Sequence, residues 1–151
     1  MLLPCSRVFL PSPAERIDED ETEFAVMLAR PRDAALTHAI VNVSSIDGLK
    51  AKNGLVAYAS SKWAIRGLTK VAAIEFGRHN IRVNALGTGW TTAEEIPLEK
   101  QREELLVRYT PLRRKGHPRD IGPLLVYLCS EACDYTTGQA VYVDGGLNAH
   151  P

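Results

Sequence analysis

The sequence carries no excess of charge of either sign and has no apolar stretch long enough to cross a membrane. Eighteen Lys and Arg balance eighteen Asp and Glu in 151 residues, so the formal net charge is zero. This balance gives no electrostatic reason for binding nucleic acid or an anionic membrane. The apolar residues 1–10 lack a basic start and are interrupted by Pro4 and Arg7, so they resemble neither a secretory signal nor a membrane span. We expect neither a nucleic-acid partner nor a membrane partner.

Cysteine and histidine are also scarce. Cys5, Cys129 and Cys133 are too few for a disulfide framework and suit a reducing compartment, so we expect a cytoplasmic protein. Cys129 and Cys133 are one helical turn apart, but no cysteine or histidine cluster completes a metal site, and packing in the core is the expected role. We therefore expect no metal. The four histidines are scattered near the ends of predicted elements: His38, His79, His117 and His150.

A glycine-rich phosphate loop is not recognisable either. Such a loop places three glycines between a strand and a helix whose N-terminus receives a pyrophosphate. The one G-x-G in the chain, Gly87-Thr-Gly89, lacks the third glycine. It also follows the apolar run 80–86 in the middle of the chain, whereas the phosphate loop follows the first strand of such a fold. With 45% hydrophobic residues, the chain can bury one core but not a second domain.

A strand, a helix and a second strand follow one another in the middle of the chain. Residues 39–45 form an apolar run, which predicts a strand buried on both faces, and residues 46–48 predict a turn. A long helix is expected from Tyr58 to Phe76, closed by Gly77. Residues 80–86 predict the next strand. Strand, helix and strand in this order predict a right-handed parallel crossover.

Three polar side chains in this unit suggest proton-transfer chemistry. Tyr58 and Lys62 are at i and i+4, so they are neighbours on one helix face. A positive charge within about 4–6 Å favours the ionised form of an acidic group, so Lys62 would make Tyr58 a better acid and base. Ser45, at the end of the preceding strand, could hold a reacting oxygen. A tyrosine and a lysine at this spacing are a weak signal alone, and an exposed lysine beside a half-buried tyrosine is the simpler alternative.

The remaining elements extend the same architecture. Residues 97–109 predict a charged amphipathic helix, typical of a mobile lid, and Arg113–Lys115 predicts a solvated loop. Pro118 begins another helix, with its apolar face at residues 121–128. Residues 138–143 predict a third strand. Three parallel strands with crossover helices indicate an α/β fold, the C-terminal part of a doubly wound, Rossmann-like parallel sheet.

Residues 39–146 resemble the C-terminal part of a short-chain dehydrogenase/reductase. The order and spacing of the matching blocks are highly specific. The amino-acid sequence around residues 61–68 is most similar to that of bacterial hydroxysteroid dehydrogenases. The blocks are Ile40-Val-Asn-Val-Ser-Ser45 with Gly48, Tyr58-Ala-Ser-Ser-Lys62-Trp-Ala, Arg66-Gly-Leu-Thr-Lys70, Ile81-Arg-Val-Asn84, Thr110-Pro-Leu112, Gly116-His-Pro-Arg-Asp-Ile121, Thr137-Gly138 and Val143-Asp-Gly-Gly146.

The resemblance implies hydride transfer between NAD or NADP and an alcohol or ketone. On the matching positions, Tyr58 would be the general acid and base and Ser45 would hold the substrate oxygen. Lys62 would assist Tyr58 and bind the nicotinamide ribose. Residues 87–92 would approach the nicotinamide, so Tyr58, Lys62, Thr88, Gly89 and Thr91 are the expected cofactor-binding residues. Trp90, Ile96 and Leu98 are compatible with an apolar substrate and equally with plain packing.

The chain departs from the family pattern in two places. Thr88 stands where the family has proline before Gly89, and Ala93 stands where a hydroxyl is usual, although Thr91 and Thr92 are adjacent. Upstream, the dinucleotide-binding half of the fold is largely missing. We therefore expect residues 1–38 to form an atypical N-terminal segment (loop, acidic run and a helix near 21–30) and residues 39–151 to form the single catalytic part.

Two structural consequences are expected. The helix 58–76 is apolar nearly all round, so it needs a partner besides its own sheet, and in the family this helix lies at a dimer interface. We expect a homo-oligomer formed through it. The strand 39–45 would have an open edge, which invites aggregation unless the N-terminal forty residues or another subunit cover it. Residues 7–10 are a candidate substitute strand within that N-terminal segment.

Three hypotheses about the function remain. The first is an active NAD(P)-dependent oxidoreductase whose cofactor site is rebuilt by the N-terminal segment or a partner chain. The second is a truncated relative, folded and dimerising but catalytically weak or silent. The third is a remnant without a function of its own.

Overall fold

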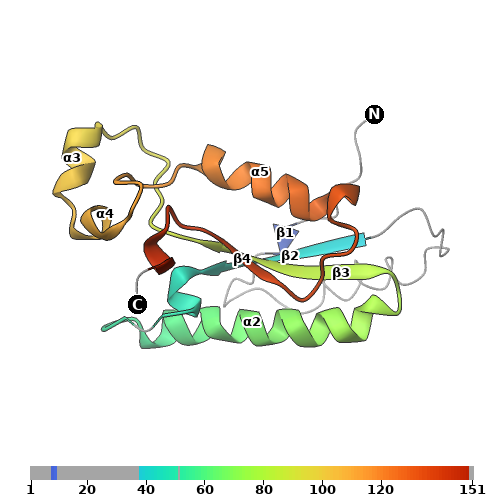
Figure 1. The fold of residues 1–151 in the computed structure, drawn as a ribbon. Coiled ribbons are helices and arrows are strands. Elements are labelled where there is room, and N and C mark those ends of the chain that lie inside the picture. The colour runs from blue at the N-terminus through green and yellow to red at the C-terminus, as the bar shows by residue number, and fades with distance from the viewer. Residues whose placement is uncertain (1–7, 10–37, 51, 150–151) are drawn as a thin grey trace.

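The computed structural model describes residues 8–9, 38–50 and 52–149. They form a parallel sheet in the order β1-β2-β3-β4, in which β1 is Val8–Phe9, β2 is His38–Ser45, β3 is Ile81–Thr88 and β4 is Ala140–Val143 (Figure 1). This confirms the α/β class and the parallel sheet. The helix expected near 21–30 and most of the segment 1–38 lie outside the described residues.

The helices agree with the expected pattern except at one point. The expected helix 58–76 is α2, Val56–Gly77, and the helix that starts at Pro118 is α5, Pro118–Cys129. The single helix expected over 97–109 is wrong. It is divided into α3, Leu98–Glu103, and α4, Leu105–Tyr109, by Glu104, whose backbone is extended at φ −73° and ψ 133°.

Three short 3₁₀ helices complete the fold: η1, Ile46–Gly48, η2, Glu131–Cys133, and η3, Leu147–Ala149. None of the helices in the described residues has the length and apolar character needed to cross a membrane. The short helices α3 and α4 lie beyond the end of the sheet where the chain leaves β3 (Figure 1).

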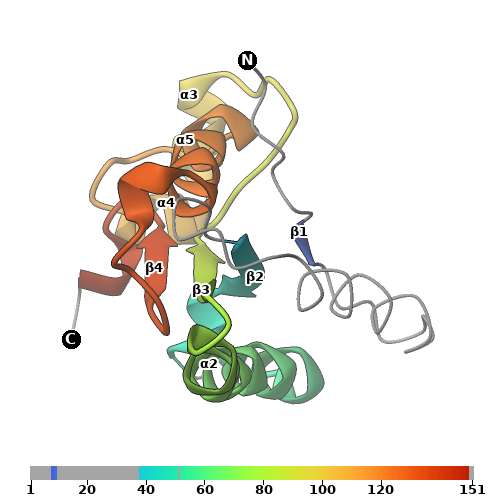
Figure 2. The same ribbon diagram turned by 90° about the vertical axis from the view of Figure 1, so that its right-hand side faces the viewer.

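The sheet is a middle layer between α2 on one face and α5 on the other (Figure 2). Each face has its own buried cluster, because alternate residues of a strand point to opposite faces. On the α2 side, Ile81 and Val83 pack with Ala72 and Ala73. On the α5 side, the cluster consists of Val41, Leu86, Leu128 and Cys133, with Cys129 packed against it. Both neighbouring cysteines therefore serve core packing, as expected.

Two buried polar residues of β3 tie the sheet to the segment between α5 and β4. Arg82 donates to the carbonyl oxygens of Leu128 at 2.8 Å and Ser130 at 3.1 Å, at the C-terminus of α5. Asn84, 1% exposed, donates to the Thr136 carbonyl oxygen and accepts from the Gln139 amide. Since a buried polar group without a partner destabilises the fold, these contacts explain polar residues inside a central strand.

The edge of β2 that faces away from β3 is partly covered from within the chain. Val8 pairs with Val41 and Phe9 with Asn42, in parallel. The prediction that residues 7–10 supply a substitute strand is thus confirmed for Val8–Phe9. This pairing covers two of the eight residues of β2.

Gly48 is where the end of β2 and η1 approach α2 most tightly. A Cβ atom there would lie 2.6 Å from the Lys62 carbonyl oxygen and 2.7 Å from Ser44 Oγ. We expect Gly48→Ala to lower the free energy of unfolding by about 1–3 kcal/mol, because the backbone of α2 must move. Gly67→Ala is the matched control, since a Cβ there meets nothing within 4 Å. Alanine inside a helix should raise the free energy of unfolding by up to about 1 kcal/mol relative to glycine. Urea unfolding of both variants checks this, and equal midpoints would contradict it.

Candidate active site

The candidate site begins where β2 and β3 end side by side. Ser45 and Thr88, the last residues of the two strands, are register partners. In open parallel sheets, ligands bind beyond the carboxyl ends of the strands, so this edge is where a site is expected. Ser45 is 5% exposed and also begins η1, because its Oγ accepts a hydrogen bond from the Asp47 amide at 3.2 Å.

The start of α2 is fixed to this edge by contacts with one carbonyl group. Ser44 Oγ donates to the Lys62 carbonyl oxygen at 3.0 Å, and the backbone of Gly48 packs against the same carbonyl. One turn further on, Arg66 Nη1 donates to the Gly48 carbonyl oxygen at 3.0 Å. The strand end, η1 and the first turns of α2 therefore form one packed unit, which positions the side chains that α2 carries there.

The structure brings Tyr58 and Lys62 together, as the i, i+4 spacing requires. Lys62 Nζ lies 5.6 Å from the centre of the Tyr58 ring. The same ammonium donates to the Val43 carbonyl oxygen at 3.1 Å, which holds it against β2. Tyr58 is 45% exposed, so its ring is accessible to a small molecule at the strand ends. A phenol beside a fixed cation is suited to proton transfer.

The expected cofactor residues after β3 are divided between two places. Thr88 is half-buried beside Ser45, whereas Gly89 contacts the end of β4 and Thr91 contacts the segment before α5. The Gly89 amide donates to the Val143 carbonyl oxygen at 2.9 Å, and a Cβ on Gly89 would lie 2.6 Å from Asp144 Cα. Thr91 forms an isolated parallel bridge with Gly116. Glycine is therefore required at position 89 by backbone packing.

A cavity of about 240 Å³ adjoins this segment, at the ends of β3 and β4. None of Ser45, Tyr58 and Lys62 lines it, so the cavity is not the place of the Tyr58–Lys62 pair. Its lining residues are Gly89, Trp90, Thr91, Leu112, Arg114, Gly116, Asp120, Ile121, Val143, Asp144 and Gly145.

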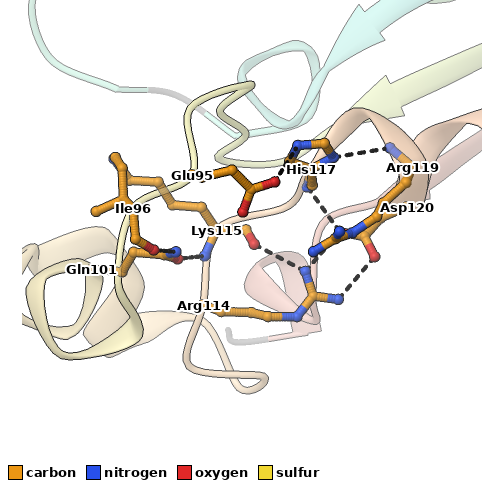
Figure 3. A network of polar contacts seen from close by, with 8 residues as sticks. All are labelled: Glu95, Ile96, Gln101, Arg114, Lys115, His117, Arg119 and Asp120. Atoms are coloured by element: carbon orange, nitrogen blue, oxygen red, sulfur yellow. Dashed lines mark hydrogen bonds and ion pairs between the residues drawn. The ribbon is translucent and has the colours of Figure 1, made fainter.

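An ion pair and a helix cap fix the loop before α5 (Figure 3). Arg114 binds both carboxylate oxygens of Asp120, at 2.6 and 2.9 Å, and the same carboxylate accepts from the His117 amide at 2.8 Å. These hydrogen bonds, first that of Arg114 and then that of the His117 amide, lower the pKa of Asp120 from 3.8 to about 2. His117 Nδ1 accepts from the Arg119 amide at 3.4 Å, so this histidine caps α5.

The prediction of a solvated loop at Arg113–Lys115 is wrong for Lys115, whereas Arg114 is ion-paired but keeps 40% of its side chain exposed. Besides the Arg114 ion pair, Lys115 Nζ lies 2.6 Å from Glu104 Oε1, and its side chain is only 11% exposed. Trp90 Nε1 donates to Glu104 Oε2 at 3.0 Å. The Lys115 amide donates to Gln101 Oε1, whose side chain also bonds to the Ile96 carbonyl oxygen (Figure 3). Sequence reasoning missed this cluster because its charges are distant along the chain.

The residues at the edge fit one end of a nicotinamide cofactor. The exposed Tyr58 hydroxyl and the adjacent Lys62 ammonium are groups that can bind ribose hydroxyls. For the pyrophosphate, residues 8–9, 38–50 and 52–149 contain no glycine-rich turn between a strand and a helix N-terminus. The described residues thus fit the nicotinamide–ribose end alone. They also contain no group of three or more His, Cys, Asp or Glu that could hold a metal ion.

Comparison with known proteins agrees with this geometry. The sequence model of a family described as enoyl-(acyl carrier protein) reductase matches residues 24–148. An A-factor type gamma-butyrolactone 1'-reductase (1S-forming) of Streptomyces virginiae is 41% identical over 129 residues, which are 83% of this chain and 49% of that protein.

Solved structures show the same similarity. A 4-hydroxyisoleucine dehydrogenase complexed with NADH superposes with a TM-score of 0.72 at 31% identity, over 88% of this chain and 54% of that one. An acetoin dehydrogenase from Enterobacter cloacae superposes with a TM-score of 0.72 at 30% identity, over 87% and 50%.

The fold and the strand-end site define a Rossmann-like α/β protein whose helix after β2 carries a tyrosine–lysine pair. Together with the sequence matches, this places the chain in a single family. It belongs to the short-chain dehydrogenase/reductase family. The chain spans about half the length of the relatives that it matches.

The Arg114–Asp120 pair leads to a prediction about stability. The pKa of Asp120 in the folded protein is about 2, below its usual 3.8. The ionised Asp120 carboxylate therefore stabilises the folded state fully above about pH 4, and this stabilisation is lost as the pH falls through about 2. We expect Asp120→Asn to lower the free energy of unfolding by about 1 kcal/mol at pH 7, since the ion pair is partly exposed.

Urea unfolding between pH 7 and pH 2 measures this effect. The difference between the original protein and Asp120→Asn should shrink as the pH falls from about 4 towards 2. Glu99→Gln, which changes an exposed carboxylate in α3, is the control and should show no such change. A constant difference down to pH 2 would contradict the assignment.

Proposed function

We propose that this protein is an NAD(P)-dependent oxidoreductase that interconverts an alcohol and a carbonyl compound. The observation that supports this most directly is the exposed Tyr58 beside the Lys62 ammonium, 5.6 Å from the ring centre, at the carboxyl ends of β2 and β3. Membership in the short-chain dehydrogenase/reductase family supports the reaction class. The substrate is a small alcohol or ketone.

The proposed catalytic triad consists of Ser45, Tyr58 and Lys62. The Tyr58 hydroxyl gives its proton to the carbonyl oxygen in reduction and, as phenolate, takes it back in oxidation. The Lys62 ammonium stabilises the phenolate electrostatically. The nicotinamide, when bound, supplies the hydride in reduction and accepts it in oxidation. Thr88, Gly89 and Thr91 are proposed to lie along its ring, and Lys62 to bind its ribose.

Ser45 is proposed to orient the substrate oxygen. Its Oγ already accepts a hydrogen bond from the Asp47 amide at 3.2 Å, so its hydroxyl hydrogen is left to donate elsewhere. A substrate oxygen beyond the end of β2 is a suitable acceptor. Ser45 would thereby hold the carbonyl for proton transfer from Tyr58.

We also propose that α2 mediates a homo-oligomer. Its sheet side buries Ile65, Thr69, Ala72 and Ala73. The remaining surface exposes large apolar side chains, among them Leu68 at 54% and Ile74 at 81%. Apolar side chains repeated on one exposed helix face are typical of an interface, and a second copy of α2 offers a matching surface. The other exposed members are Val56, Trp63 and Val71.

The exposed face of α2 also favours a second candidate function. A folded module could dimerise through this face without turning over a substrate, because dimerisation needs none of the triad residues. The two candidates differ in cofactor binding, which only the oxidoreductase requires.

Titration of the folded protein with NADH and NADPH, followed by fluorescence or calorimetry, tests the proposed activity. We expect saturable binding at micromolar concentration and reduction of ketones. Tyr58→Phe should retain the fold and lose about 10²–10⁴-fold in turnover, because the phenol that transfers the proton is gone. Tyr109→Phe, which changes an exposed tyrosine in α4, is the matched control and should keep its activity. If neither cofactor binds up to millimolar concentration, the dimerising module is the better description.

Sedimentation at micromolar concentration tests the oligomer. We expect Ile74→Glu to shift the protein to monomer without unfolding it, because this side chain is 81% exposed in the single chain and a charge would be buried at the interface. Glu75→Ala, on the neighbouring exposed residue, should leave the oligomer intact. A protein that is monomeric before any substitution would refute the interface.

A further inference from the structure

Two lysines from different parts of the chain lie near the ring of Trp90. Lys52 Nζ and Lys115 Nζ each lie 5.6 Å from the centre of its ring. The ring is 41% exposed, and its Nε1 is held by Glu104. A tryptophan fixed at its nitrogen and flanked by two cations is a rigid, partly open platform at which positive charge gathers.

The two lysines differ in how their charge is balanced. Lys115 is 2.6 Å from Glu104 Oε1, and hydrogen bonds from Lys115 and then Trp90 lower the pKa of Glu104, so this carboxylate stays ionised. Lys52 is exposed, and within the described residues no carboxylate lies within salt-bridge distance of it. The cluster of Lys52, Trp90, Glu104 and Lys115 therefore carries one positive charge that the described part of the chain does not neutralise.

The position of Lys52 connects this charge to the candidate active site. Lys52 lies between η1 and α2, in the segment that joins Ser45 to Tyr58. Trp90 comes two residues after Thr88, the register partner of Ser45. The contact between Lys52 and Trp90 thus joins the two segments that leave the neighbouring ends of β2 and β3.

We propose that Lys52 and Trp90 form a binding site for a carboxylate of the substrate, which makes the substrate an oxo acid or hydroxy acid. The Lys52 ammonium donates hydrogen bonds to the carboxylate, and the Trp90 face packs against the carbon chain that links it to the reacting carbonyl. Glu104 and Lys115 are positioning residues, since they hold Trp90 in place. The assignment of the substrate as an oxo acid or hydroxy acid rests on the proposed function, whereas carboxylate binding by Lys52 and Trp90 does not.

Binding of matched acids and esters tests the site directly. The chain has two tryptophans, so Trp63→Phe makes Trp90 the single fluorophore while keeping a ring for Arg66. Acetoacetate and levulinate are titrated against their methyl esters, in the presence and absence of NADH and NADPH. We expect at least one acid to quench Trp90 fluorescence saturably and to bind about five-fold more tightly than its ester, as one partly exposed ion pair allows.

Two lysine variants separate the proposed contact from general attraction. Lys52→Met should remove the preference for the acid over its ester and leave the ester affinity unchanged. Lys100→Met, on an exposed lysine of α3, should keep the preference. The inference is overturned if no acid binds better than its ester, if Lys52→Met keeps the preference, or if Lys100→Met removes it to the same degree.

The outcome is independent of turnover. Tyr58→Phe should retain the preference for the acid, because its hydroxyl contacts the carbonyl oxygen that an acid and its ester share. A protein that prefers acids but binds neither NADH nor NADPH and reduces no carbonyl compound refutes the proposed function and keeps the carboxylate site. A protein that reduces neutral ketones and shows no acid preference keeps the proposed function and refutes the site.

Discussion

The rest of the site depends on the close approach of α2 to the end of β2. The Lys62 carbonyl oxygen accepts from Ser44 Oγ, and a Cβ on Gly48 would lie 2.6 Å from that oxygen. This contact sets the height and rotation of the first turns of α2 relative to the strand end. Because Tyr58 and Lys62 are carried by those turns, their positions follow from backbone packing. The hydrogen bond from Lys62 Nζ to the Val43 carbonyl oxygen then fixes the ammonium itself.

A second group of contacts fixes the segments beyond the sheet. Asp120 joins Arg114 to the start of α5, and Glu104 joins Trp90 to Lys115. The two ion pairs join residues that are 6 and 11 positions apart, and the hydrogen bond from Trp90 to Glu104 joins residues that are 14 apart. Paired charges and capped helix ends hold loops that bury little apolar surface of their own. Trp90 is thereby placed next to Lys52, where one positive charge is left without a carboxylate among the described residues.

Much of the fold could be predicted from local patterns. The apolar runs at 39–45 and 80–86 correspond to β2 and β3, and the apolar helix expected from Tyr58 corresponds to α2. These elements are predictable because a continuous apolar run indicates a strand buried on both faces and a 3.6-residue apolar period indicates a helix. The break at Glu104 was missed, since helix propensity cannot reveal that its carboxylate is bound by Trp90 and Lys115. The burial of Lys115 beside Glu104 could not be predicted for the same reason.

Residue order was enough to predict the family, the parallel strand–helix–strand unit and the pairing of Tyr58 with Lys62. The last of these follows because i, i+4 neighbours meet on any α-helix. Which residues face one another across the strand ends could be learned only from the folded chain. Ser45 lies beside Thr88, Lys52 lies against Trp90, and β1 covers part of the edge of β2. The physical reason is that strand register and long-range ion pairs depend on packing between segments distant in the chain, which no local period encodes.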